Sequence, residues 1–201
     1  FINEFMADNV TTIADEEGEY DDWIEIHNGS ESLIDLSGMV LGNEIAEPGE
    51  WSFPEGTTLD SGGFLLVWAD DDTDQGPLHA DFKLSAGGEE IVLLDSAFNG
   101  FGLIDSITFG PQETDISMGR VLDGDPVWTT FVIPTPGASN DPSTCPWDLD
   151  DNGSVGIADL LMIIDLWGKC VCVADFDQDG RVAIPDLLAI IDHWGECPKD
   201  G

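Results

Sequence analysis

The sequence predicts a mainly β protein, in which a two-sheet β-sandwich precedes a small all-α pair of loop–helix units. Two observations carry this prediction. Over the first two thirds of the chain, short runs rich in Val, Ile, Phe and Trp alternate with turn residues, and no helical period is sustained. Near the C-terminus, a pattern recurs after 27 residues, and each copy runs into an apolar stretch with helical spacing.

The β part is expected between residues 2 and 132. Short strands at regular spacing, separated by turns such as Gly29-Ser30 and Asn99-Gly100, are typical of a two-sheet sandwich. In the second run, alternation places Glu25 and His27 outward and the neighbouring isoleucines inward. The predicted strands are 2–6, 22–28, 39–42, 51–53, 64–68, 90–94, 103–109 and 127–132.

The two parts are joined by a segment that lacks apolar periodicity. Residues 134–144 are rich in Pro, Ser and Gly, a composition typical of a linker. The predicted organisation is a sandwich over residues 1–139, a linker over 140–144 and a loop–helix module over 145–198.

The recurring pattern has the spacing of a calcium loop. Each copy places oxygen-bearing side chains at loop positions 1, 3, 5 and 12 and glycine at position 6, as in an EF-hand loop. We therefore expect two Ca²⁺ ions, with a backbone carbonyl at position 7 and both carboxylate oxygens at position 12 as further ligands. The predicted ligands are Asp148, Asp150, Asn152, Ser154 and Asp159 in the first loop, and Asp175, Asp177, Asp179, Arg181 and Asp186 in the second.

Each predicted loop leads into an apolar helix, and no helix precedes it. The apolar positions are Leu160, Leu161, Ile163, Ile164 and Trp167 in the first helix, and Leu187, Leu188, Ile190, Ile191 and Trp194 in the second. Because either face is large, we expect the two helices to bury each other and any apolar remainder to be a docking surface.

All four cysteines lie in this module, and an even count in an acidic chain favours an oxidising, extracellular setting. Within one repeat, a helix of roughly 15 Å separates the cysteines, whereas a disulfide requires Cα atoms within about 7 Å. If the helices are antiparallel, Cys145–Cys197 with Cys170–Cys172 is favoured; Cys145–Cys170 with Cys172–Cys197 remains the alternative. Cys-x-Cys spacing disfavours a zinc site.

The charge of the chain is extreme, with 42 acidic and 5 basic residues and a net charge of −37. Of the acidic residues, 30 lie in residues 1–144, whose basic residues are Lys83 and Arg120. Such a surface repels nucleic acid and anionic membranes and favours a soluble monomer. No apolar run approaches the roughly 20 residues of a membrane helix. Since the chain begins at Phe1, we interpret it as a piece of a longer protein.

No catalytic motif is found, so no enzymatic activity is predicted. A Gly-x-Ser-x-Gly elbow, a phosphate loop and a His-Glu-x-x-His motif do not occur. His27, His79 and His193 are isolated in the sequence. We interpret the acidic segments 16–22 and 70–74 as exposed, solvated loops in preference to ion-holding loops.

The duplicated pattern Asp-x-Asp-x-[Asn/Asp]-Gly-x-Val-x-x-x-Asp-Leu-Leu, over residues 145–198, resembles a dockerin module. Dockerins are extracellular modules that bind cohesin domains on scaffold proteins or cell surfaces and often tether polysaccharide-degrading enzymes. The resemblance implies a cohesin-like or other cell-surface protein as partner. At loop positions 10 and 11, where dockerins often carry a polar pair that cohesin contacts, this chain has Ile157-Ala158 and Ile184-Pro185.

The N-terminal part resembles a bacterial lamin-tail domain, which implies an immunoglobulin-like sandwich. The resemblance covers about residues 1–139. It is carried by Ile2-Asn3-Glu4-Phe5-Met6-Ala7, Asp22-Trp23-Ile24-Glu25-Ile26-His27-Asn28, Ile34-Asp35-Leu36-Ser37-Gly38, Phe53-Pro54-Glu55-Gly56-Thr57-Thr58-Leu59 and Gly63-Phe64-Leu65-Leu66-Val67-Trp68-Ala69.

Together these expectations describe a non-catalytic, secreted fragment, located outside the cell or at its surface. The sandwich would act as a binding or spacer domain, and the calcium module would dock to a partner protein. Two alternatives stay open. One is a calcium-dependent extracellular hydrolase, and the other is a purely structural, calcium-locked cap or anchor.

Overall fold

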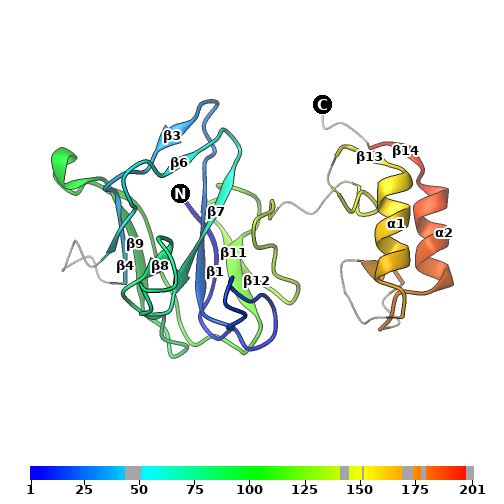
Figure 1. Ribbon diagram of the computed structural model, residues 1–201, viewed down its shortest axis with the longest axis horizontal. Coiled ribbons are helices and arrows are strands. Elements are labelled where there is room, and N and C mark those ends of the chain that lie inside the picture. Colours follow the sequence, from blue (N-terminus) through cyan, green and yellow to red (C-terminus); the bar gives the residue numbers. More distant parts are fainter. Residues whose placement is uncertain (44–50, 141–144, 151, 169–173, 178–179, 198–201) are drawn as a thin grey trace. The chain divides into compact units, whose positions relative to one another are not determined.

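The computed structural model describes residues 1–43, 51–140, 145–150, 152–168, 174–177 and 180–197 (Figure 1). The chain forms two compact units, Phe1–Asp141 and Pro142–Gly201. The first unit consists of β-strands and one short 3₁₀ turn, and the second contains two short α-helices. The prediction of a mainly β chain is therefore confirmed.

Among the described residues, two main sheets and a separate two-stranded sheet form the first unit. All neighbouring strands are antiparallel except β7 and β8, which are parallel. The six-stranded sheet has the order β12 (Trp128–Phe131), β11 (Ser117–Arg120), β1 (Ile2–Met6), β2 (Trp23–His27), β7 (Phe64–Ala69), β8 (His79–Ala80). The four-stranded sheet has the order β10 (Leu103–Thr108), β9 (Glu90–Leu94), β4 (Val40–Gly42), β5 (Trp51–Ser52), and β3 (Ile34–Asp35) pairs separately with β6 (Thr58–Leu59).

The core of the sandwich lies between the two sheets. Successive side chains of a strand point to opposite faces, so alternate residues of each central strand enter the core. Phe5 of β1 and Ile24 of β2 share one apolar cluster with Leu41 of β4 and Ile91 of β9, and these four side chains are fully buried. All eight predicted strands are present, with ends that differ by at most one residue.

The outer face of the six-stranded sheet differs from the sequence-based expectation. Glu25 and His27 do point away from the core, but they are only 0 % and 7 % exposed. Residues 135–140, which resemble a linker in composition, cover Glu25, whereas the rings of Phe1 and Phe64 pack against His27. Gly137 N donates to Glu25 Oε2 (2.6 Å), and Thr135 Oγ1 donates to Glu4 Oε2 (2.7 Å). Residues 135–140 are thus part of the sandwich unit.

The second unit is a pair of antiparallel helices, α1 (Ile157–Asp165) and α2 (Ile184–Asp192) (Figure 1). Strand β13 (Ser154–Val155) precedes α1 and pairs with β14 (Gly195–Glu196), which follows α2. The start of α1 therefore lies beside the end of α2. At the opposite end of the helices, Gly168 N donates to Val182 O (2.9 Å). The unit has its own apolar core, in which Ile163 and Ile190 are fully buried.

A disulfide closes this unit. Cys145 and Cys197 are bonded, with Cα atoms 5.5 Å apart. This contact follows from the antiparallel helices and confirms the Cys145–Cys197 bridge of the favoured pairing, so the alternative pairing is wrong for these two cysteines. Cys170 and Cys172 lie outside the described residues.

Candidate metal centres in the helical unit

Asp159, at loop position 12, organises the first loop. Its side chain is fully buried at the third residue of α1. Its Oδ1 accepts hydrogen bonds from Leu149 N (2.7 Å) and Asp150 N (3.2 Å), and its Oδ2 accepts one from Gly156 N (2.7 Å). One carboxylate therefore satisfies an amide at the helix N-terminus and also fixes the beginning of the loop.

The second loop repeats this arrangement. Asp186 is also fully buried, and its Oδ1 accepts from Phe176 N (2.7 Å) and Asp177 N (3.4 Å), while its Oδ2 accepts from Ala183 N (2.7 Å). Every bond matches its counterpart 27 residues earlier. The sequence repeat is thus a repeat of hydrogen bonds as well as of residue types.

The first residue of each loop closes the turn through the glycine at position 6. Asp148 Oδ2 accepts from Gly153 N (2.7 Å), and Asp175 Oδ2 accepts from Gly180 N (2.8 Å). Gly153 and Gly180 have φ of +86° and +91°, in the left-handed region that favours glycine. Burial raises the pKa of the Asp148 carboxyl, the amides of Gly153 and Asn152 lower it, and the nearby charge of Asp159 raises it, with a net rise.

The carboxylates of each loop are close enough to share one ion. Oxygens of Asp148, Asp150 and Asp159 lie within 4.8 Å of one another. The same holds for Asp175, Asp177 and Asp186. Ca²⁺ binds oxygen at roughly 2.3–2.6 Å, so two ligands on opposite sides of the ion are about 5 Å apart. The residues present therefore fit a calcium ion in each loop.

The remaining predicted ligands have different surroundings. Asn152 is exposed, its side-chain amide donates to Asp150, and its Oδ1 accepts from Ser154 N (3.1 Å) and Ser154 Oγ (2.6 Å). Ser154 begins β13, and Arg181 is exposed at the equivalent place in the second loop. Asp179 lies outside the described residues.

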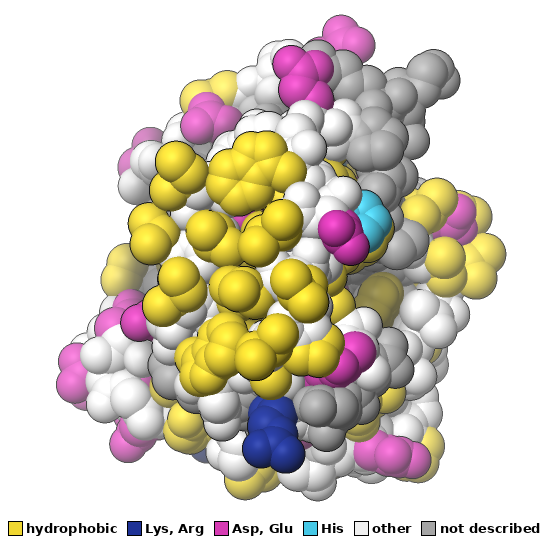
Figure 2. All heavy atoms as spheres, turned by 90° about the vertical axis from the view of Figure 1, so that its right-hand side faces the viewer, with side chains coloured by type: hydrophobic (Ala, Val, Ile, Leu, Met, Phe, Trp, Pro, Cys, Tyr) yellow, Lys and Arg dark blue, Asp and Glu magenta, His cyan; other side chains and the backbone are white. Residues whose placement is uncertain are grey.

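A large apolar face remains exposed on the helices. It consists of four residues from each repeat, which are 46–69 % exposed and which we call the apolar face: Ile157, Leu161, Ile164, Trp167, Ile184, Leu188, Ile191 and Trp194. The expectation that the helices bury each other's apolar residues is met only by Ile163 and Ile190, with Leu160 and Leu187 half-buried. Figure 2 shows hydrophobic side chains gathered on this side of the helical unit.

A cluster in the sandwich unit was not predicted. The sequence predicts Asp70 in a solvated loop and His79 as an isolated histidine. In the structure both residues are buried, and they are hydrogen-bonded to each other. Oxygens of Asp15 and Asp70 and a ring nitrogen of His79 lie within 4.8 Å of one another. The pairing of β2 with β7 and of β7 with β8 brings these distant residues together, which no local sequence signal indicates.

The geometry defines an antiparallel β-sandwich followed by a helix pair with two acidic loops. In a comparison with known families, residues 1–111 match the Lamin Tail Domain. Because this match spans more than half of the 201 residues, the chain belongs to the lamin tail domain family. Strands β11 and β12 lie beyond the match, but β11 pairs with β1 in the same sheet.

No curated protein and no solved structure was found to match the chain. The family assignment supports an immunoglobulin-like domain with a binding or spacing role. Neither helix among the described residues has the length and apolar character that crossing a membrane requires.

Proposed function

We propose that the protein is a non-catalytic, extracellular two-unit fragment whose helical unit is a calcium-stabilised docking module of the dockerin type. The lamin tail domain would act as a binding or spacing unit in a larger extracellular protein. The partner would be a cohesin-like or other cell-surface protein. The proposal is carried by one observation: two equivalent loops hold three carboxylates each and support one continuous, exposed apolar face.

Calcium is supported by the charge that each loop concentrates. Three carboxylates within 4.8 Å repel one another, and backbone amides donate hydrogen bonds to them without removing that repulsion. A bound divalent cation would neutralise the loop and hold its residues around one centre. Asp159 and Asp186 link this centre directly to the first turn of α1 and α2. Ion binding and helix stability would therefore be coupled.

Docking is supported by the pattern of exposure. The eight residues of the apolar face occur as four pairs separated by 27 residues, whereas Ile163 and its counterpart Ile190 are fully buried. Exposed apolar patches of this kind mark interaction surfaces. At loop position 10, Ile157 and Ile184 are among the most exposed members of the face. We therefore expect a partner with an apolar surface at the positions where dockerins usually present polar side chains.

Calcium titration of the full chain by isothermal calorimetry tests the first half of the proposal. We expect Asp159→Ala and Asp186→Ala each to lose one equivalent of Ca²⁺ and to reduce the helical circular dichroism signal. Asp192→Asn, at the exposed end of α2, is the matched control and should keep both. Identical Ca²⁺ uptake by the unchanged chain and its three variants would refute calcium binding at the loops.

A pull-down from extracellular and cell-surface proteins, with and without a chelator, tests the second half. The double variant Leu161→Asp/Leu188→Asp should lose a partner that the unchanged protein captures only with Ca²⁺. Phe98→Asp, which alters an almost fully exposed residue of the sandwich, should retain it. Equal capture by both variants would exclude the apolar face as the docking surface.

A purely structural role is the second candidate, because the Cys145–Cys197 bridge already closes the helical unit covalently. A calcium-locked anchor would bind Ca²⁺ as described but capture no protein through the apolar face. The two experiments separate these roles, since the first concerns the ions and the second the partner.

A further inference from the structure

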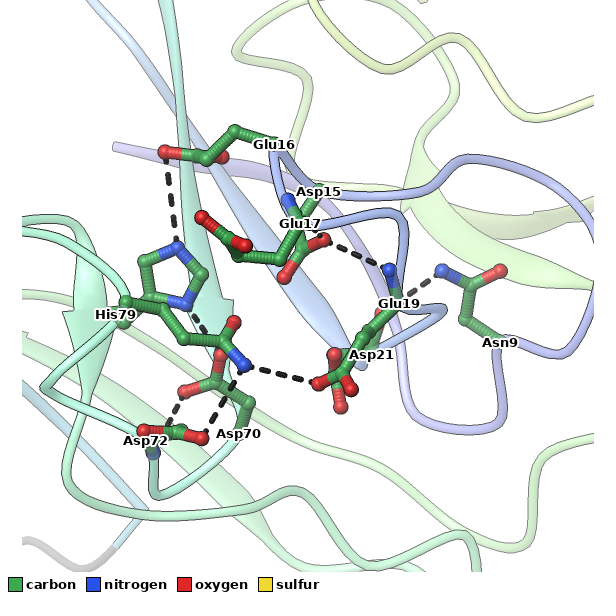
Figure 3. Close-up of polar contacts among 10 residues, drawn as sticks. Asn9, Asp15, Glu16, Glu17, Glu19, Asp21, Asp70, Asp72 and His79 are labelled. Atoms are coloured by element: carbon green, nitrogen blue, oxygen red, sulfur yellow. Dashed lines mark hydrogen bonds and ion pairs between the residues drawn. The ribbon is translucent and has the colours of Figure 1, made fainter.

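Three carboxylates of one loop in the sandwich unit gather beside the end of β7 and the start of β8 (Figure 3). The loop before β2 contributes Asp15, Glu19 and Asp21. Facing this loop, Asp70 follows β7, Gln75 lies in the connection to β8, and His79 begins β8. Figure 3 shows Asp15, Glu19 and Asp21 on one side of the cluster and Asp70 and His79 on the other. Oxygens of Asp15, Glu19 and Asp21 lie within 4.8 Å of one another.

Asp15 is held rigidly through only one of its oxygens. Its Oδ1 accepts hydrogen bonds from Glu17 N (2.9 Å) and Glu19 N (2.8 Å), and Asp15 N donates to Glu19 O (2.9 Å). The second oxygen, Oδ2, is buried, and Asp15 as a whole is only 9 % exposed. This oxygen has no hydrogen-bond partner among the described residues. A buried carboxylate oxygen without a donor is unfavourable, because nothing replaces the hydrogen bonds that it would form with water.

Asp21 presents a second oxygen of the same kind. Its Oδ2 is buried and lacks a hydrogen-bond partner within the part of the chain that the structure describes. Its backbone is fixed because Asn9 Nδ2 donates to Asp21 O (2.8 Å) and to Ile13 O (2.7 Å). Two oxygens that need a positive partner are therefore placed in the same cluster by separate parts of the loop.

The β7–β8 side of the cluster is also fixed. Gln75 Nε2 donates to Glu19 Oε2 (2.9 Å) and to Asp72 Oδ2 (3.2 Å), and thereby joins the two segments. His79 Nδ1 is hydrogen-bonded to Asp70, and its Nε2 lies 3.7 Å from Glu16 Oε1. The imidazole thus belongs to the wall beside the three carboxylates, which leaves an all-oxygen set of the kind that hard cations prefer.

We propose that Asp15, Glu19 and Asp21 bind a divalent cation of the calcium type in the sandwich unit. The ion would supply the positive partner that Asp15 Oδ2 and Asp21 Oδ2 lack. It would also fix the Glu19 carboxylate, which accepts the hydrogen bond from Gln75 of the β7–β8 connection. This site is independent of the loops of the helical unit and does not rest on the docking function.

Proton–nitrogen correlation NMR of the full chain during Ca²⁺ titration tests the site without any substitution. The amides of Glu17 and Glu19, which donate to Asp15, should shift in a saturable way, together with the side-chain amide of Gln75. We expect a dissociation constant of about 0.1–1 mM, typical of extracellular calcium modules. Resonances of these groups that stay unchanged at 10-fold higher Ca²⁺ (about 10 mM) would overturn the proposal.

Variants give a second and independent readout. Asp15→Asn and Asp21→Asn should each bind one Ca²⁺ fewer than the unchanged chain, whatever number the helical unit contributes. Glu55→Gln, at an exposed acidic residue elsewhere in the sandwich, is the control and should bind the full number. Unchanged stoichiometry in both asparagine variants would refute the site. A second outcome would also refute the site: Zn²⁺ shifts the resonances of His79, while Ca²⁺ leaves the amide resonances of Glu17 and Glu19 unchanged.

Discussion

Asp105 and Arg120 form an ion pair that joins the two sheets of the sandwich, with Oδ2 and Nη2 2.7 Å apart. Asp105 is in β10 of one sheet, and Arg120 is in β11 of the other. Both also hold β1, because Ile2 N donates to Asp105 Oδ2 (2.9 Å) and Arg120 Nε donates to Ile2 O (2.7 Å). The β10–β9 register is irregular between Leu103 and Asp105, and such a bulge re-aims side chains.

Arg120→Lys should destabilise the sandwich by about 2–3 kcal/mol, since one ammonium cannot replace the three directions of the guanidinium. Arg120 Nη1 also donates to Asp125 O (2.6 Å), so a lysine leaves at least one buried acceptor unpaired. Urea unfolding followed by tryptophan fluorescence measures the effect. Lys83→Arg, at an exposed site of the same unit, should not change the midpoint.

The sandwich should lose stability as the pH rises from about 4.5 to about 8. Burial, with smaller contributions from the Glu4 and Asp123 charges, raises the pKa of Glu25 from its ordinary value of 4.5 to about 8, although bonds from Asn3 and Gly137 lower it. The folded state therefore binds a proton that the unfolded state releases. The stabilisation is full below pH 4.5 and falls by about 1.4 kcal/mol per pH unit until about pH 8.

Glu25→Gln provides the control for this titration. The glutamine oxygen can still accept a hydrogen bond from Asn3 or Gly137, but it carries no charge at any pH. Urea unfolding at pH 5, 6, 7 and 8 should give a flatter dependence for the variant than for the unchanged chain. Since both proteins share the general repulsion of their acidic surface, parallel curves would contradict the role of Glu25.

Removal of the Cys145–Cys197 bridge should destabilise the helical unit. The bridge closes a segment of 52 residues, and a loop of that length gives about 4 kcal/mol in the chain-entropy model. In the double variant Cys145→Ala/Cys197→Ala, the helical circular dichroism signal should therefore be lost at a lower temperature. The sandwich transition should stay in place. A helical transition that does not move would show that the fold of this unit is independent of the bridge.

Buried and exposed positions of the helices should respond differently to truncation. Ile190→Ala removes a fully buried side chain from the small core and should cost about 2–5 kcal/mol. Leu188→Ala alters the apolar face and should change stability by less than about 0.5 kcal/mol. Thermal unfolding at saturating Ca²⁺ measures both. Equal losses would mean that the apolar face is covered within the chain itself.

Strand β9, which is rich in β-branched and other apolar residues, was predicted with the bounds that the structure has. Strand β11 (Ser117–Arg120) was not predicted, because Ser, Gly and Arg have no apolar alternation. Its place is fixed by tertiary contacts instead: Ser117 Oγ donates to Glu4, and Arg120 holds Ile2. The burial of Glu25 was not predicted either, because residues 135–140 return over it from more than 100 residues away.

The acidic loops of the helical unit could be located because their carboxylates lie within 12 consecutive positions. The cluster around Asp15 could not, since Asp70 and His79 are brought to it by strand pairing rather than by spacing. The prediction that the two helices bury each other's apolar residues overestimated the buried surface. Two nine-residue helices contact each other along a narrow stripe, so only Ile163 and Ile190 are fully covered.

The Cys145–Cys197 disulfide of the helical unit has a mechanical consequence. Tension applied between the segments before Cys145 and after Cys197 travels through the sulfur–sulfur bond and bypasses both helices. The chain between the cysteines, whose sequence separation is 52, thus contains hidden length, on the order of 170 Å when extended. Only chemical reduction would release it, so the unit should transmit tensile load without unravelling.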